Sequence, residues 1–212
     1  MGKKVFKPEN MHKLESPERY KELPPGEILD LMGLTAGQEV VDLGCGLGYF
    51  AIPAAGLVGE NGHVYGLDIS PEMLSAMEDR TPEDLKGRLT GMLIGPEGPI
   101  NEGQILVGRD LGETHSSNPV VLQAGSLDHV LIATVLHEVP HAKKTLEEAL
   151  ALLKPGGKLA VIEWIKKEMP HGPRQSIRIA REDLDHLAGQ VGMTHVLYKD
   201  LSMRFYISIY KK

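Results

Sequence analysis

A run of alternating glycines is the strongest chemical signal in the sequence. Asp42 ends a β-branched, apolar segment, and Gly44, Gly46 and Gly48 follow it at alternate positions. Glycines let the backbone turn sharply and approach a ligand closely, and the helix that we expect to follow supplies free N–H donors. The pattern therefore predicts a nucleotide-type ligand at the carboxyl end of a parallel strand.

A second acidic residue lies where the ribose of such a ligand would be bound. Asp68 ends the next apolar segment, twenty residues after Gly48. A carboxylate at this point can accept hydrogen bonds from both ribose hydroxyls. The two strand ends therefore predict one site with two acidic side chains.

The spacing of the glycines distinguishes between two classes of ligand. Dinucleotide-binding loops have the pattern G-x-G-x-x-G, but here the third glycine of that pattern would fall on Tyr49. The carboxylate of Asp42 would repel a pyrophosphate and favour a cationic ligand. S-adenosylmethionine carries a sulfonium and an ammonium group and no phosphate, so the residues favour this cofactor. An NAD-dependent oxidoreductase remains the weaker alternative.

A histidine just past a later predicted strand is the candidate catalytic residue. His137 and Glu138 follow the strand 127–133, where an acceptor would meet the cofactor, and a histidine there could take a proton from a hydroxyl or a carbon acid. The alternatives are a loop residue or a group that caps the following helix. With His141 the pair also resembles a metal cluster, but we expect no metal.

The elements that must position these residues alternate between strands and helices, which predicts a parallel sheet with right-handed crossovers. A terminal hairpin of 195–201 and 204–210 predicts that the last strand runs antiparallel. The other predicted strands are 39–43, 63–69, 127–133 and 158–165, and the predicted helices are 24–33, 49–58, 70–79, 143–153 and 181–191.

Two segments do not follow this alternation. Region 81–126 is rich in glycine and proline and is a candidate insertion. A third strand must lie within it: our first choice is 104–109, followed by Asp110, and our second is 89–94, while both together would form an inserted hairpin. The polar segment 166–178 is predicted to be a mobile lid over the acceptor site.

The composition limits the class of protein. The chain has 212 residues, which favours one domain, and we expect an N-terminal arm over 1–23 followed by a domain over 24–212. Asp and Glu number 29 against 23 Lys and Arg, a net charge of -6, so nucleic acid is not an expected partner. The single cysteine, Cys45, excludes an internal disulfide framework.

The sequence also contains no run of about 18 apolar residues, so we expect no membrane span. Its basic N-terminus lacks the apolar run of a signal peptide. We therefore expect a cytoplasmic protein with a small-molecule partner, and the sequence leaves the oligomeric state open.

Four motifs, in this order, resemble those of class I S-adenosylmethionine-dependent methyltransferases. They are DLGCGLG at 42–48, VYGLDISPEML at 64–74, SLDHVL at 126–131 and LLKPGGKL at 152–159. Residues 19–25, and Glu163-Trp164 with Gly172-Pro173, resemble uncharacterised members of the branch that includes the ubiquinone/menaquinone biosynthesis methyltransferases.

The resemblance implies an α/β fold, a Rossmann-like doubly wound seven-stranded sheet whose last strand is antiparallel. It implies methyl transfer to a small-molecule acceptor; a catalytically inactive cofactor-binding module is the main alternative. The residues implied to touch the cofactor are Asp42, Gly44, Cys45, Gly46, Gly48, Asp68, Ile69, Met73, Asp110, Ala133 and Thr134.

The resemblance also implies a role for each of these residues. The glycine loop, with Cys45, would line the methionine part through its backbone, and Asp42 would hold the ammonium group. Asp68 would bind the ribose, and Ile69 and Met73 would lie at the adenine. Asp110 would meet the adenine amino group, although the interval from Asp68 to Asp110 is longer than the family usually shows. Ala133 and Thr134 would close over the cofactor.

Overall fold

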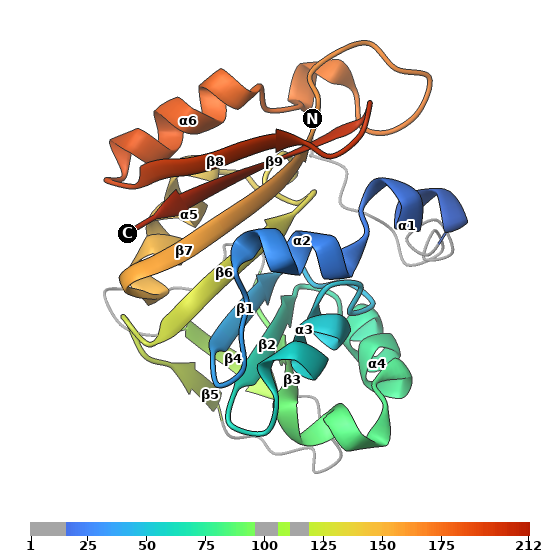
Figure 1. Ribbon diagram of the computed structural model, residues 1–212, viewed down its shortest axis with the longest axis vertical. Helices are drawn as coiled ribbons and strands as arrows, with labels where there is room; N and C mark the ends of the chain where they lie inside the picture. The colour runs from blue at the N-terminus through green and yellow to red at the C-terminus, as the bar shows by residue number, and fades with distance from the viewer. Residues whose placement is uncertain (1–15, 96–105, 111–118) are drawn as a thin grey trace.

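The computed structural model describes residues 16–95, 106–110 and 119–212 (Figure 1). The strands of these segments form one sheet in the order β5-β4-β3-β2-β1-β6-β7-β9-β8. Their bounds are β1 (Glu39–Leu43), β2 (His63–Asp68), β3 (Leu89–Leu93), β4 (Leu106–Asp110), β5 (Pro119–Leu122), β6 (Leu127–Ala133), β7 (Leu153–Trp164), β8 (Thr194–Asp200) and β9 (Phe205–Lys211).

Seven of these strands form the predicted doubly wound sheet. β3, β2, β1, β6 and β7 are parallel neighbours, and β9 pairs antiparallel with both β7 and β8. The last strand therefore runs against its neighbours, which confirms the predicted fold class.

The first choice for the third parallel strand is wrong. The strand that pairs parallel to β2 is β3, from Val64 opposite Leu89 to Asp68 opposite Leu93. β4 lies beside β3 but runs antiparallel, and β5 pairs antiparallel with β4. The glycine at position 91 makes the sequence pattern of β3 a weak strand signal. In the structure, a Cβ there would lie 3.2 Å from the Met77 Cε of the neighbouring helix, so the packing leaves little room for a side chain.

Helices cover both faces of the sheet (Figure 1). α2 (Pro25–Met32), α3 (Ala51–Val58) and α4 (Pro71–Arg80) contribute apolar side chains to the core on one face. α5 (Ala142–Leu152) and α6 (Arg181–Gln190) cover the other face. The central strands are buried on both sides, as expected for parallel strands between helical layers.

Local signals in the sequence set where two of these helices begin or end. Ser70 caps α4, because its hydroxyl accepts a hydrogen bond from the Met73 amide at 3.2 Å, and Pro71 occupies the first turn. Gly33 ends α2 with a φ of 76°, which is a left-handed conformation. Among the helices of the described segments, none is long and apolar enough to cross a membrane.

The described part of the N-terminal arm is a short helix, α1 (Pro17–Glu22). An ion pair joins Glu22 to Arg204, the residue before β9. In Figure 1, α1 lies on the side of the molecule where β7 and the other parallel strands end. α1 is therefore placed beside the edge at which the candidate site residues gather.

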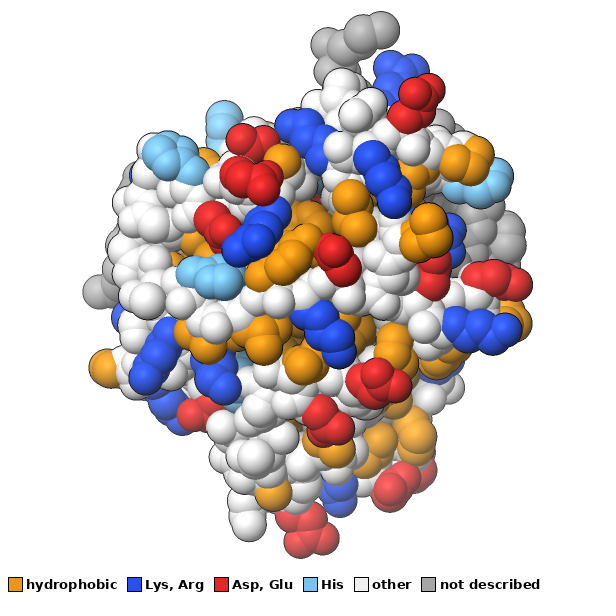
Figure 2. Space-filling view, turned by 45° about the horizontal axis from the view of Figure 1, so that its top comes forward, with side chains coloured by type: hydrophobic (Ala, Val, Ile, Leu, Met, Phe, Trp, Pro, Cys, Tyr) orange, Lys and Arg blue, Asp and Glu red, His pale blue; other side chains and the backbone are white. Residues whose placement is uncertain are grey.

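The charge on the face seen in Figure 2 is mixed rather than segregated. Figure 2 shows one face, on which Lys and Arg side chains are interspersed with Asp and Glu and with apolar side chains. Such interspersion weakens the field that any one patch presents to a phosphate backbone.

Candidate active site

The glycine loop between β1 and α3 is built on left-handed backbone. Gly44, Gly46 and Gly48 have φ values of 78°, 53° and 81°, a region that favours glycine. Space is limiting as well, since a Cβ on Gly44 would lie 2.4 Å from Val135 Cγ2, and one on Gly48 would lie 2.6 Å from Met77 Cγ. The backbone conformation therefore favours glycine at all three positions, and the packing leaves no room for a side chain at Gly44 or Gly48.

Asp68 holds the glycine loop against the end of β2. Its Oδ2 accepts a hydrogen bond from the Gly46 amide at 2.9 Å, and its Oδ1 accepts one from the Ser70 amide at 2.9 Å. Burial raises the pKa of this carboxyl above its ordinary value, although these amides oppose the shift. Each carboxylate oxygen has a second lone pair, so Asp68 can still accept from the hydroxyls of a ribose.

Asp42 is a buried carboxylate with an unused acceptor. The Ala51 amide donates a hydrogen bond to it, yet burial, and then the charge of Asp68, raise its pKa to about 7. Its Oδ2 has no hydrogen-bond partner among the described residues. A buried polar atom left unpaired is costly, and an ammonium group would satisfy this one. The site therefore fits the α-ammonium group of S-adenosylmethionine.

Three further residues implied to touch the cofactor lie close to these. Burial, followed by the charges of Asp42 and Asp68, raises the pKa of the Cys45 thiol well above its ordinary value, so the thiol stays protonated. Ile69 follows β2 with 41% of its side chain exposed, whereas Met73 is buried in the core. Ile69 is thus open to a ligand, and Met73 lies beneath the surface; their cofactor contacts remain predictions.

The predicted position of Asp110 in the sheet is wrong. It does not follow the third parallel strand but ends the antiparallel strand β4, in register with Met92 of β3. This still places its backbone beside the last residues of β3. Its contact with an adenine amino group remains an untested prediction.

The loop after β6 is strained where it meets the glycine loop. Ala133 ends β6, and Thr134 has a φ of 59°, the one positive value among the non-glycine residues that the structure describes. The Thr134 amide donates to the Ile162 carbonyl at 2.7 Å, and the next side chain, Val135, packs on Gly44. Such strain often marks functional sites; the contact of Ala133 and Thr134 with a cofactor remains a prediction.

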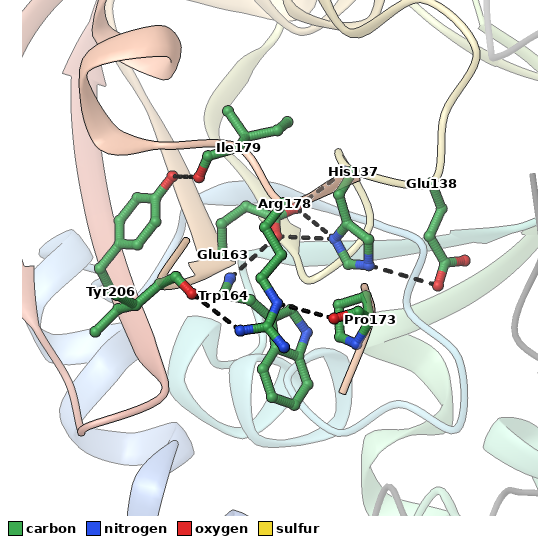
Figure 3. Close-up of polar contacts among 9 residues, drawn as sticks. His137, Glu138, Glu163, Trp164, Pro173, Arg178, Ile179 and Tyr206 are labelled. Carbon is green, nitrogen blue, oxygen red and sulfur yellow. Dashed lines mark hydrogen bonds and ion pairs between the residues drawn. The ribbon is translucent and has the colours of Figure 1, made fainter. Parts of the chain in front are cut away.

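His137 forms a buried dyad with Glu163 (Figure 3). His137 Nδ1 lies 2.8 Å from Glu163 Oε2 and 3.0 Å from Oε1. Glu163, at the end of β7, is completely buried and also accepts hydrogen bonds from the backbone amides of His137 and Trp164, both at 3.1 Å. On the other side of the ring, Nε2 lies 3.7 Å from Glu138 Oε1. The imidazole is thus fixed between two carboxylates.

One alternative role for His137 is wrong. The helix that follows begins at Ala142, and His141 occupies its N-cap position, so His137 does not cap it. In the part of the chain that the structure describes, no three His, Cys, Asp or Glu side chains are grouped to hold a metal ion. No local sequence pattern indicates the dyad, because Glu163 lies 26 residues from His137.

The segment 166–178 is organised around one arginine. The Arg178 guanidinium lies 5.4 Å from the centre of the Trp164 ring (Figure 3). Gly172 packs against the same ring, since a Cβ there would lie 2.7 Å from Trp164 Cζ3. The segment is therefore fastened beside the dyad. The carbonyls that accept from Arg178 are those of Pro173 at 2.9 Å, Lys167 at 2.8 Å, Ile165 at 3.1 Å and His171 at 3.2 Å.

Comparison with solved structures shows the fold. A SAM-dependent methyltransferase from Aquifex aeolicus is 22% identical and superposes with a TM-score of 0.80, over 98% of this chain and 99% of its own. The [4+2]-cyclase SpnF is 16% identical with a TM-score of 0.68, over 90% of this chain and 81% of its own. Because a cyclase shares the fold, the architecture alone does not define the reaction.

Sequence comparison shows the family. Demethylmenaquinone methyltransferase of Oceanobacillus iheyensis is 29% identical over 155 residues, which are 73% of this chain and 56% of that protein. The enzyme of the same name from Bacillus mycoides is 28% identical over 68% of this chain and 52% of its own length. The match thus spans about half the length of these curated relatives. A family described as a methyltransferase domain matches residues 41–159. The chain therefore belongs to the methyltransferase-domain family of the S-adenosylmethionine-dependent, class I type.

Proposed function

We propose that this protein transfers the methyl group of S-adenosylmethionine to a small-molecule acceptor, with His137 as the general base. The observation that carries the proposal is the His137 imidazole, 2.8 Å from the buried Glu163 carboxylate. His137 follows β6, and Glu163 lies at the end of β7. The dyad therefore shares the carboxyl edge of the sheet with Asp42 and Asp68.

The residues of this chain divide the binding of the cofactor between them. The glycine loop would receive its methionine part, Asp42 its ammonium group and Asp68 its ribose. When bound, the cofactor supplies an electrophilic methyl group. The protein's share is to orient the two reactants and exclude water, and an aligned pair can save roughly 7–11 kcal/mol of the barrier.

Glu163 determines which nitrogen of His137 can act as the base. An ionised carboxylate only accepts hydrogen bonds, so the Nδ1 beside Glu163 carries the hydrogen and Nε2 keeps its lone pair. A proton taken from the acceptor would therefore be held at Nε2. The resulting imidazolium would lie between Glu163 and Glu138, whose negative charges stabilise it.

This arrangement suits an acceptor that must lose a proton, such as a phenol or a carbon acid. The curated relatives are named for a demethylated menaquinone. A reduced naphthoquinol is thus the first acceptor class to test, because loss of a hydroxyl proton makes its neighbouring ring carbon more nucleophilic. An easily methylated amine would not need the base.

The experiment is single-turnover transfer from methyl-labelled S-adenosylmethionine to a reduced demethylmenaquinone with a short side chain. We expect His137→Ala to lower kcat by ~10²–10⁴ with cofactor affinity unchanged within twofold. His141→Ala, at the exposed N-cap of α5, is the matched control.

Each other outcome has a definite meaning. Wild-type turnover in His137→Ala would refute the base and leave orientation as the mechanism. Cofactor binding without labelled product from any phenol, carbon acid, amine or thiol tested would favour the inactive binding module. Absence of cofactor binding would overturn the whole proposal.

A further inference from the structure

The helix of the N-terminal arm is fastened to the end of the glycine loop through Tyr49. The Tyr49 hydroxyl donates to the Leu23 carbonyl at 2.8 Å, and its ring centre lies 5.0 Å from that of Tyr20. The Arg19 guanidinium lies over the same ring, 4.9 Å from its centre. Since Tyr49 directly follows Gly48, these contacts place Arg19 beside the predicted binding site for the methionine part of the cofactor.

Arg19 differs from the other arginines that pack against aromatic rings on this side of the molecule. Arg204 pairs with Glu22, and Arg178 donates to four backbone carbonyls. The Nε of Arg19, by contrast, is buried and has no hydrogen-bond partner among the described residues. A buried guanidinium N–H without an acceptor is costly, so this donor is suited to an anionic ligand.

Arg19 and Asp42 lie at the two ends of the glycine loop, since Asp42 precedes Gly44 and Arg19 packs on Tyr49, which follows Gly48. The two charges interact, since each opposes the effect of burial on the other's pKa. Yet Arg19 Nε and Asp42 Oδ2 both lack partners within the described segments, so the side chains do not satisfy each other. One cationic and one anionic group remain available around the same loop.

This pair matches the two charges of an α-amino acid. We propose that Arg19 binds the α-carboxylate of the cofactor's methionine part, while Asp42 holds its α-ammonium group. The inference rests on the proposed function, because it concerns the same cofactor. It assigns the N-terminal arm a part in recognition: a ligand that lacks the carboxylate leaves Arg19 unpaired and binds more weakly.

The test compares two ligands that differ only in that carboxylate. S-Adenosylmethionine and its decarboxylated form are titrated calorimetrically into the full chain, as wild type, Arg19→Gln and Lys21→Gln. Lys21 is an exposed residue of the same helix and serves as the matched control. We expect wild type and Lys21→Gln to bind S-adenosylmethionine at least tenfold more tightly than the decarboxylated form. In Arg19→Gln the ratio should fall to within threefold, mainly through loss of affinity for S-adenosylmethionine.

The other outcomes overturn the inference in distinguishable ways. If Arg19→Gln weakens both ligands equally, Arg19 supports the arm and does not bind the carboxylate. If affinity for S-adenosylmethionine is unchanged, Arg19 has no part in binding it. If wild type binds S-adenosylmethionine and its decarboxylated form with nearly equal affinity, the inference is refuted even if Arg19→Gln does not fold. If wild type binds decarboxylated S-adenosylmethionine and 5′-methylthioadenosine but shows no preference for the carboxylate, the cofactor proposal survives and this one fails. If it binds none of them, both fail.

Discussion

Replacing Asp42 by asparagine should stabilise the ligand-free protein at alkaline pH while weakening cofactor binding. Burial raises the pKa of Asp42 from 3.8 to about 7, so the unfolded chain loses this proton at lower pH than the folded protein. The folded state then binds more protons, and wild-type stability falls as pH rises from about 4 to about 7. The difference between the two pKa values corresponds to about 4 kcal/mol.

Asparagine removes the buried charge but adds a new unpaired group. Its oxygen can keep the hydrogen bond from the Ala51 amide, whereas its NH₂ group would lie where Asp42 Oδ2 has no partner. An unsatisfied buried donor costs about 1–3 kcal/mol. We therefore expect Asp42→Asn to gain about 1–3 kcal/mol over wild type at pH 8.5. From pH 5 to pH 8.5, the free energy of unfolding of Asp42→Asn should rise relative to that of wild type by about 2–3 kcal/mol.

The assay is urea unfolding of the ligand-free protein at pH 5 and pH 8.5, with Asp30→Asn, an exposed aspartate of α2, as the control. The difference in free energy of unfolding between this control and wild type should be the same at both pH values. A destabilisation by Asp42→Asn that is the same at pH 5 and pH 8.5 would refute the reasoning, because it would mean that Asp42 carries no buried charge. In titrations at pH 8.5, the same variant should bind S-adenosylmethionine at least tenfold more weakly.

Three further changes test other parts of the site. Asp68→Ala should lower cofactor affinity at least tenfold, because charge-assisted hydrogen bonds contribute about 1.5–3 kcal/mol each; unchanged affinity by calorimetry contradicts the assignment. Gly46→Val introduces a β-branched residue at a φ of 53°, so the cofactor-induced rise in Tm should vanish, and its persistence in a folded variant would place the cofactor elsewhere. Arg178→Met removes the donor to four carbonyls of the segment 166–178 and its flank, so hydrogen exchange there should accelerate while α2 stays protected; unchanged exchange would show that other contacts hold the segment.

Most of the sheet could be predicted because its signals are local. The apolar segments 39–43 and 127–133 match β1 and β6 to the residue, and Ser70-Pro71 marks the start of α4. The third strand could not be identified this way. Gly91 makes β3 a weak strand by composition, and it is accommodated by the side chain of Met77, a contact that depends on tertiary packing.

The same distinction applies to the site. Asp42 and Asp68 could be predicted to share a site because each ends a parallel strand, and such ends meet at one edge of the sheet. The partnership of His137 with Glu163 could not, because nothing in the local pattern of either residue specifies the other. Arg19 was equally hidden, since only the packing of the arm on Tyr49 shows where its guanidinium lies.

The edge that carries the site also concentrates features that oppose folding. The buried carboxylate of Asp42 has an Oδ2 without a hydrogen-bond partner among the described residues, Thr134 has a positive φ, and three glycines of one loop are left-handed. A ligand that neutralises Asp42 removes part of this cost, and it does so only in the folded protein. Binding at 100 times Kd would add about 2.7 kcal/mol of stability by mass action alone. The strain and the unpaired charge thus give this edge a physical reason to bind a cation.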